Sequence, residues 1–305
     1  MKRAVSISIG SSTRDKEAEI ELLGEKVHLE RIGTDGDMKK AAQLYEELDG
    51  KVDAFGVGGT GLGFLIDTHW YTLHSVKFMV QNVKKTPVAD GTGFKSFLGQ
   101  RVPELLDKKL GGAITKKRVL IPSAVDRYSL SRAFMASGYE IVYGDMMFAL
   151  GLPFAIRSDV GLKRLAKLLL PIASRLPFKW LYPIGESQEL RTPKWVEHFK
   201  WATVVGGDCH YITRYMPDDM EGKVIVTNTT TPKDHELFRN AGVKYLVTTT
   251  PVLDGRSFGT NMMEAGLVAA MGRTEPIDYA NPGTYFKDME NAINKLDLQP
   301  HILEL

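Results

Sequence analysis

Residues 119–143 read VLIPSAVDRYSLSRAFMASGYEIVY. A short apolar strand, Val119–Ile121, precedes a helical stretch, Ser129–Ser137, and a second strand, Glu140–Tyr143. The alternation returns later, with expected strands at 202–205, 223–226 and 244–247 and expected helices at 233–240 and 261–271. Short apolar strands that alternate with helices are typical of a parallel sheet covered on both faces. The sequence therefore predicts an α/β fold with a Rossmann-like parallel-sheet domain.

The first third of the chain predicts a smaller N-terminal α/β domain. Residues 4–9 alternate like a strand, and residues 19–31 indicate a hairpin around Gly24. Further expected elements are a helix over 38–48 capped by Asp37, a strand over 52–57 and a helix over 73–83. We expect residues 1–115 to form the substrate-side domain and residues 116–305 the Rossmann-like, dinucleotide-binding-type domain.

Composition limits the class of protein. The chain has 305 residues, a net charge of +2 and 43% hydrophobic residues, which fits two globular domains and gives no sign of a nucleic-acid partner. Cys209 is the only cysteine, so no disulfide forms within the chain and a reducing compartment is the simpler interpretation. The sequence has neither an N-terminal apolar signal nor a membrane-spanning run. We expect a cytoplasmic protein.

Residues 162–182 interrupt the strand–helix alternation with a leucine-rich, basic segment. One interpretation is a helix that lies on a membrane surface. The other is a packed helical insertion or the surface of a homodimer. Pro171 and Pro177 predict two short helices rather than one long helix. We favour the packed insertion and expect no membrane partner.

The carboxyl ends of the strands in the second domain form a polar rim, which is where open parallel sheets bind ligands. The first turn, 122–127, has no glycine to let backbone amides approach a pyrophosphate, and Asp126 would repel phosphate although Arg127 could offset it. Asp145 follows the turn by roughly 20 residues, the spacing of a carboxylate that binds the adenosine ribose, although acids there also cap helices. The expected cofactor-binding residues are Ser123, Ala124, Asp126, Arg127, Asp145, Asp208, Asn228 and Thr249.

Three other motifs have both a functional and a structural interpretation. Asp90, on the turn 89–94, is either a carboxylate that shares a substrate proton or part of a strand-ending turn. The run 208–210, Asp-Cys-His, suggests a metal or a nucleophile, but no second cluster supports it, so no metal is expected. Arg256 precedes a helix start that could bind a substrate carboxylate, or the helix is simply capped by Thr260.

The order of these pieces resembles the shikimate/quinate dehydrogenase family. Residues 88–94, Val-Ala-Asp-Gly-Thr-Gly-Phe, are similar to its Asn-Thr-Asp-Gly-x-Gly-Phe motif and lead into a helix, as in the family. The strand 118–121 and its turn come next, and Thr231-Pro232 with the run 241–243 resemble a later segment. The resemblance covers about residues 86–271 and concerns order and spacing more than identity.

The resemblance implies an oxidoreductase that moves a hydride between NAD or NADP and a polyhydroxylated ring carboxylate. Asp90 would polarise the substrate hydroxyl, a nearby lysine (we select Lys85) would be the base, and Asp145 would favour NAD over NADP. The expected substrate-binding residues are Ser11, Ser12, Thr60, Thr92, Arg256 and Asn261. The alternative is a non-redox relative, a sensor or a different enzyme, that binds a small anionic metabolite between its domains. The glycine-free turn favours the alternative.

Overall fold

The computed structural model describes the whole chain except residues 113, 178–190, 251 and 254–255. The chain forms two compact units, each built from separate stretches. Unit 1 comprises residues 1–94, 170–185 and 258–298, and unit 2 comprises residues 95–169, 186–257 and 299–305. This division differs from the predicted 1–115 and 116–305, because the chain leaves unit 1 after Phe94, returns to it over residues 170–185 and returns again at Phe258.

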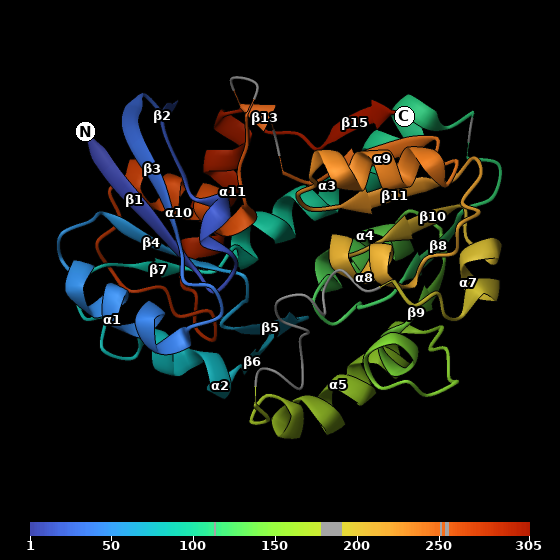
Figure 1. Cartoon of the computed structure of the whole chain (residues 1–305), viewed down its shortest axis with the longest axis horizontal. Coiled ribbons are helices and arrows are strands. Elements are labelled where there is room, and N and C mark those ends of the chain that lie inside the picture. Colours follow the sequence, from blue (N-terminus) through green and yellow to red (C-terminus); the bar gives the residue numbers. More distant parts are fainter. Residues whose placement is uncertain (113, 178–190, 251, 254–255) are drawn as a thin grey trace. The chain divides into compact units, whose positions relative to one another are not determined.

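Unit 1 contains a five-stranded sheet in the order β2-β3-β1-β4-β7 (Figure 1). Its strands are β1 (Lys2–Ser8), β2 (Lys16–Leu22), β3 (Glu25–Gly33), β4 (Ala54–Gly58) and β7 (Val88–Ala89). Strand β2 is antiparallel to β3, and the other neighbours are parallel. The predicted hairpin is confirmed, and its turn uses the positive φ angles of Leu23 and Gly24.

Helices cover both faces of this sheet. They are η1 (Ser12–Arg14), α1 (Met38–Leu48), α2 (His74–Lys77), η2 (Phe78–Val80), α10 (Thr260–Ala270) and α11 (Tyr285–Lys295), with a hairpin of β5 (Gly63–Ile66) and β6 (His69–Thr72) beside them. Asp37 caps α1 as predicted. Tyr45 of α1 packs with Val5 and Phe55, whereas α10 lies against residues such as Leu29 that point to the other face.

The helix expected over 261–271 is therefore present but covers a different sheet from the one predicted. It was assigned to the Rossmann-like domain, and the structure packs it against the sheet of unit 1. An apolar helix has no local signal that identifies the sheet it will cover, so its position in the sequence was misleading.

Unit 2 contains a six-stranded sheet in the order β15-β12-β11-β10-β8-β9. Its strands are β8 (Arg118–Ile121), β9 (Glu140–Tyr143), β10 (Val204–Gly206), β11 (Val224–Thr227), β12 (Tyr245–Thr248) and β15 (His301–Glu304). All but β15 are parallel, and in chain order they are arranged 2-1-3-4-5. This is the flavodoxin-like variant of the doubly wound sheet, whose ligand site lies at the switch point between the first and third strands, here β8 and β10. The predicted Rossmann-like α/β fold is confirmed.

The helices of unit 2 pack against both faces of its sheet. They are α3 (Thr92–Leu110, which starts in unit 1), α4 (Tyr128–Ala136), η3 (Asp145–Ala149), α5 (Asp159–Ala173, which belongs to unit 1 from Leu170 onward), α7 (Val196–Trp201), α8 (Cys209–Tyr215) and α9 (Pro232–Asn240), with a hairpin of β13 (Val252–Leu253) and β14 (Arg256–Ser257). Leu120, Phe148 and Phe199 are among the residues of its core.

Helix α5 continues through Pro171, so the break expected at this proline is absent, and the second expected helix falls partly outside the described residues. Pro171 is in the last turn of α5, so the helix ends two residues after it. Residues 178–182, the end of the segment singled out in the sequence, lie outside the described residues. Among the residues that the structure describes, no helix has both the length and the apolar character to span a bilayer.

Candidate functional site

Four charged side chains meet at the switch point of unit 2. Arg127, at the end of the turn after β8, donates through Nη2 to Asp208 Oδ2, which follows β10, at 3.1 Å. The Nη1 atom of Arg127 pairs with Asp126, and Lys95 Nζ lies 3.7 Å from Asp126 Oδ1. We call Lys95, Asp126, Arg127 and Asp208 the switch-point cluster. Two cations and two carboxylates thus balance each other where such sheets bind ligands.

The cluster is largely buried, yet solvent still reaches it. The side chains of Arg127, Asp126 and Asp208 are 10%, 18% and 21% exposed. Burial would raise the pKa of Asp126, but Arg127 and Lys95 outweigh it and hold this pKa below its ordinary value. Asp126 is therefore ionised at neutral pH and paired with both cations.

Asp145 occupies the backbone donors of the first turn. Its Oδ2 accepts the N–H of Ala124 at 3.1 Å, and its Oδ1 accepts the N–H of Val125 at 2.9 Å. Burial raises the pKa of Asp145 to about 6. In a dinucleotide site these turn amides would face the pyrophosphate. Here an internal carboxylate takes them, so Asp145 holds the first turn together.

The other residues predicted around a cofactor do lie at this edge of the sheet. Ser123 and Thr249 are buried, and Asn228 Oδ1 accepts the Thr227 hydroxyl at 3.0 Å. Cys209 and His210 are the first two residues of helix α8. Burial raises the pKa of the Cys209 thiol, and the described residues contain no group of three or more side chains able to hold a metal.

Asp90 of unit 1 has two backbone partners. Its Oδ2 accepts the N–H of Leu62 at 2.7 Å, and its Oδ1 accepts the N–H of Thr92 at 2.9 Å. Its own N–H donates to the hydroxyl of Tyr279 at 3.0 Å. Asp90 is 3% exposed. These contacts support the interpretation of a strand-ending turn, in which Asp90 joins the 59–62 loop to the start of α3.

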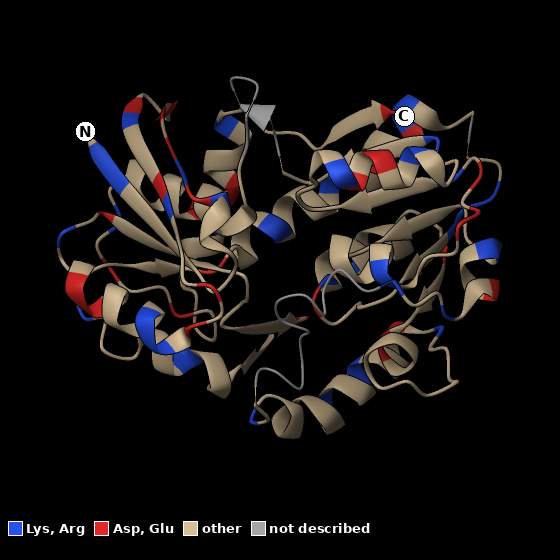
Figure 2. Ribbon diagram, viewed as in Figure 1, with Lys and Arg blue, Asp and Glu red and all other residues tan. Residues whose placement is uncertain are grey.

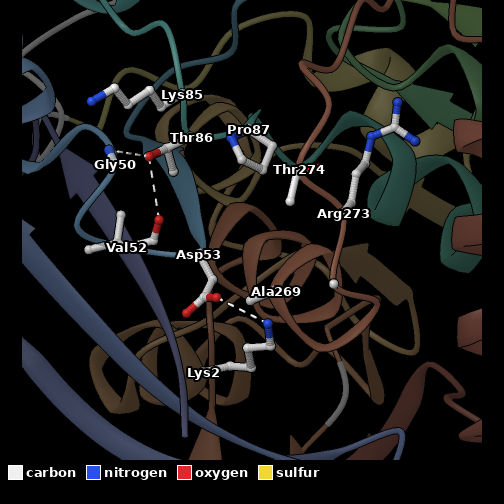
Figure 3. A pocket seen from close by; sticks show the side chains of 11 residues that line it. Lys2, Gly50, Val52, Asp53, Lys85, Thr86, Pro87, Ala269, Arg273 and Thr274 are labelled. Atoms are coloured by element: carbon white, nitrogen blue, oxygen red, sulfur yellow. Dashed lines mark hydrogen bonds and ion pairs between the residues drawn. The ribbon is translucent and has the colours of Figure 1, made fainter.

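Lys85, the predicted base, is not brought to Asp90. Strand β7 separates them, because Lys85 precedes it and Asp90 follows it. Lys85 instead lines a cavity of about 190 Å³ at the amino ends of β4 and β7, together with Asp53 and Arg273 (Figure 3). The figure shows its ammonium group directed away from Lys2 and Asp53, which pair with each other. The proposed Asp90–Lys85 pair is therefore wrong as a geometric unit.

Glu264 is a buried acid that the sequence analysis missed. It lies on α10 with no exposed surface, and its Oε1 accepts the hydroxyls of Tyr279 at 2.8 Å and Tyr285 at 2.5 Å. Its Oε2 accepts the N–H of Phe94 at 2.8 Å. Burial, and then the nearby Asp90, raise the pKa of Glu264 to about 7. We call Glu264, Tyr279, Tyr285 and Asp90 the Glu264 cluster. The sequence feature that could have revealed it is a single acid in an otherwise apolar helix.

Four of the predicted substrate-binding residues, Ser11, Ser12, Thr60 and Thr92, follow the carboxyl ends of the neighbouring parallel strands β1, β4 and β7 of unit 1. Ser11 bonds locally to Thr13, Ser12 is exposed, Thr60 donates to Gly61, Thr92 is buried and Asn261 bonds to Ser6. Arg256 belongs to β14 of unit 2, and its side chain lies outside what the structure describes. The other five belong to unit 1.

The glycines near Asp90 have a packing role. A Cβ at Gly56 would lie 2.9 Å from the carbonyl oxygen of Asn261, and one at Gly91 would lie 2.8 Å from Thr260 Oγ1. Gly91 also has a φ of +90°. The absence of side chains here therefore lets α10 approach the sheet closely.

Comparison with known proteins gives two family matches. Residues 93–305 match a family described as a domain of unknown function, DUF8754, and residues 3–90 match another, DUF8753. No curated protein matches the chain.

Several solved structures share a general likeness with this chain. A shikimate dehydrogenase from Aquifex aeolicus is 12% identical with a TM-score of 0.34, and the alignment covers 96% of this chain and 97% of the dehydrogenase chain. An Entamoeba histolytica malic enzyme is 11% identical with a TM-score of 0.37, and the alignment covers 98% of this chain and 70% of the malic enzyme chain. The substrate-binding protein of a sugar transport system from Bordetella parapertussis is 12% identical with a TM-score of 0.34. The alignment covers 91% of this chain and 83% of the substrate-binding protein. Similarities this low carry no argument about function.

Proposed function

The chain belongs to the family described as DUF8754, a domain of unknown function, and on that premise we propose that unit 2 binds an uncharged, polyhydroxylated small molecule at its switch point. The observation that carries the proposal is the charge balance of the switch-point cluster, in which Arg127 bridges Asp126 and Asp208. The proposed activity is binding without a nicotinamide cofactor.

The cluster offers the groups that hydroxyls prefer. Carboxylate oxygens accept hydrogen bonds from a polyol, while guanidinium and ammonium groups donate to its oxygens, and such charge-assisted bonds are stronger than neutral ones. Asp126 and Asp208 each retain acceptor capacity beside Arg127, since an ionised carboxylate has about four lone-pair sites. A neutral ligand leaves the charge balance of the site unchanged.

An anionic ligand fits the same site less well. A phosphate or carboxylate would add a third negative charge beside Asp126 and Asp208, whose attraction to the two cations is already satisfied. The turn amides that could offset it are bonded to Asp145. A dinucleotide would have to displace a buried carboxylate that accepts two hydrogen bonds.

Calorimetric titration of the whole chain tests the proposal. Neutral polyols such as inositols and hexoses are compared with quinate, shikimate, NAD(H) and NADP(H). We expect binding in the polyol set, and loss of that binding in Asp208→Asn, because the bridge to Arg127 is weakened. The matched control is Asp218→Asn, since Asp218 is an exposed acid of unit 2.

Two results would overturn the proposal. One is the absence of any polyol binding, and the other is polyol binding that is equal in wild type and Asp208→Asn. Tight binding of NAD(H) would instead restore the hypothesis of a dehydrogenase acting on a ring carboxylate. In that event Asp145→Asn should alter cofactor affinity, because Asp145 holds the turn that the pyrophosphate would have to reach.

A further inference from the structure

Helix α5 has one buried and one exposed side. Leu162, Ala166 and Leu170 are buried, at the spacing of one helical face. The opposite side carries Val160 and Leu168, which are 57% and 69% exposed. The apolar residues of α5 are therefore not all used for packing within the chain, which the preference for a packed insertion had assumed.

The exposed apolar side chains of the protein are concentrated in this region. Of nine large hydrophobic side chains that are exposed in the described chain, six lie between Leu150 and Ile172. Val160, Leu168 and Ile172, the last 65% exposed, repeat at multiples of four residues and so lie along one side of α5. Soluble proteins rarely leave such a group uncovered unless it binds something.

Basic residues are interspersed with these apolar side chains. Arg164 and Lys167 are exposed and lie on the same side of α5 as Leu168, and Figure 2 shows Lys and Arg positions along the helix. The only acid of α5, Asp159, bonds to Lys163 and Arg132 at 3.2 Å each. The exposed side of α5 thus carries positive charge and apolar surface without an exposed acid.

We propose that the exposed side of α5, formed by Val160, Arg164, Lys167, Leu168 and Ile172, docks onto an anionic lipid surface. Aliphatic side chains enter the interfacial region of a bilayer, while the long stems of Arg164 and Lys167 keep their charges at the phosphate level. The attraction between these cations and anionic headgroups adds to the burial of the apolar groups.

Two alternative occupants fit less well. In a two-fold dimer through α5, the Arg164 and Lys167 side chains of both copies would meet, and the exposed side has no acid to pair with them. Protein partners favour surfaces rich in aromatic residues, methionine and arginine and poor in lysine. This surface has aliphatic residues with lysine and arginine, which is the pattern of a lipid-facing helix.

Co-sedimentation of the full chain with vesicles tests this inference. We expect binding to vesicles of phosphatidylglycerol mixed with phosphatidylcholine, weakening as salt is raised, and little binding to phosphatidylcholine alone. Removing two cations, in Arg164→Gln/Lys167→Gln, should lower the partition coefficient roughly 30-fold, since each contributes about 1 kcal/mol. Leu168→Ser/Ile172→Ser should also release the protein.

Matched controls distinguish binding through this surface from nonspecific binding through positive charge or exposed apolar residues. Met135→Ser changes an exposed hydrophobic residue of α4, and Lys200→Gln/Arg239→Gln removes two exposed cations elsewhere in unit 2. Both should bind like wild type, and circular dichroism should show all variants folded. The inference is overturned if wild type stays in the supernatant, or if the Leu168/Ile172 variant still binds. It is also overturned if sedimentation velocity shows a dimer that the α5 variants dissociate.

Discussion

The two polar clusters of this protein satisfy their carboxylates by different means. Glu264 and Asp90 of unit 1 receive hydrogen bonds from two tyrosine hydroxyls and three backbone N–H groups. Asp126 and Asp208 of unit 2 are held by Arg127, with Lys95 beside Asp126. The first pair is excluded from solvent, whereas the second is still about one-fifth exposed.

This difference separates a cluster closed to solvent from one that solvent still reaches, which is the one we propose as the ligand site. Neutral donors, from the backbone and from two buried tyrosines, organise the junction of β7, α3 and α10. In our proposal, a charged side chain near solvent can replace one of its ion-pair partners by a ligand, and the burial of that side chain changes little. The residue that the family resemblance put forward as catalytic, Asp90, belongs to the cluster closed to solvent. Four predictions test this contrast.

The largest effect is expected from Glu264→Leu. The substitution leaves the Tyr279 and Tyr285 hydroxyls and the Phe94 N–H without an acceptor in the core. Unpaired buried donors cost about 1–3 kcal/mol each, so the free energy of unfolding should fall by about 3–5 kcal/mol. Urea denaturation at pH 6 measures it, with the exposed Glu290→Leu as a near-neutral control. A loss below about 1 kcal/mol would mean that the tyrosines find other partners.

The next effect is a loss of stability as pH rises. The pKa of Glu264 is about 7 in the folded protein and 4.5 as the ordinary value, so the folded state binds the proton more tightly. Its stabilising contribution is full below pH 4.5 and is lost as pH rises through 7. Between pH 5 and pH 8 the free energy of unfolding should fall by about 2–3 kcal/mol from this group.

The assignment of that pH dependence is checked with two variants. Glu264→Gln should remove most of the change near pH 7. Asp145→Asn should remove a smaller part near pH 6, because burial raises the pKa of Asp145 to about 6 with the same sign. Stability that rises from pH 5 to pH 8 in wild type would contradict the proposed protonation of Glu264.

In unit 2, Arg127→Met should cost about 2 kcal/mol. The change leaves Asp126 and Asp208 facing each other without the shared cation. The loss is smaller than for a fully buried pair, because solvent reaches these carboxylates. Adding Asp208→Asn to Arg127→Met should recover part of the stability in a double-mutant cycle. Equal losses with and without Asp208→Asn would show that the two residues are not coupled.

The smallest effect is expected from Asp90→Asn. An amide has one acceptor oxygen, so only one of the Leu62 and Thr92 N–H groups keeps its partner, and the cost should be about 1–2 kcal/mol. The polyol affinity of unit 2 should not change. Asp37→Asn, a cap at which both residues serve equally, is the control. Unchanged stability together with altered ligand binding would restore Asp90 as a functional residue.

Local features of the fold could be read from the sequence. The hairpin around Gly24, the Asp37 cap and the parallel strands of unit 2 were predicted because each follows from periodicity and turn chemistry within a few residues. The sheet that α10 covers and the continuity of α5 through Pro171 depend on tertiary packing, and no local sequence pattern indicates either.

The candidate site was predictable only in part. Asp126, Arg127 and Asp208 follow strands that the sequence reveals, and the structure joins them. Lys95 was missed because it comes from a helix upstream of the sheet. Asp145 had a spacing that serves a ribose contact and a turn cap equally well, and the structure shows its hydrogen bonds to the turn amides.

The alternation of the chain between units has a consequence for biosynthesis. The sheet of unit 1 is complete once β7 has been made, but α10, which covers one of its faces, follows only after the long stretch from Lys95 to Ser257. Until then the nascent sheet must keep an apolar face exposed, which favours association with other chains or chaperones. Folding of unit 1 should therefore be late and slow, governed by a contact between distant parts of the chain. A fragment that ends where the first family match ends, at residue 90, would carry this exposed face permanently, whereas the fragment 93–305 would leave α10 without the sheet it covers.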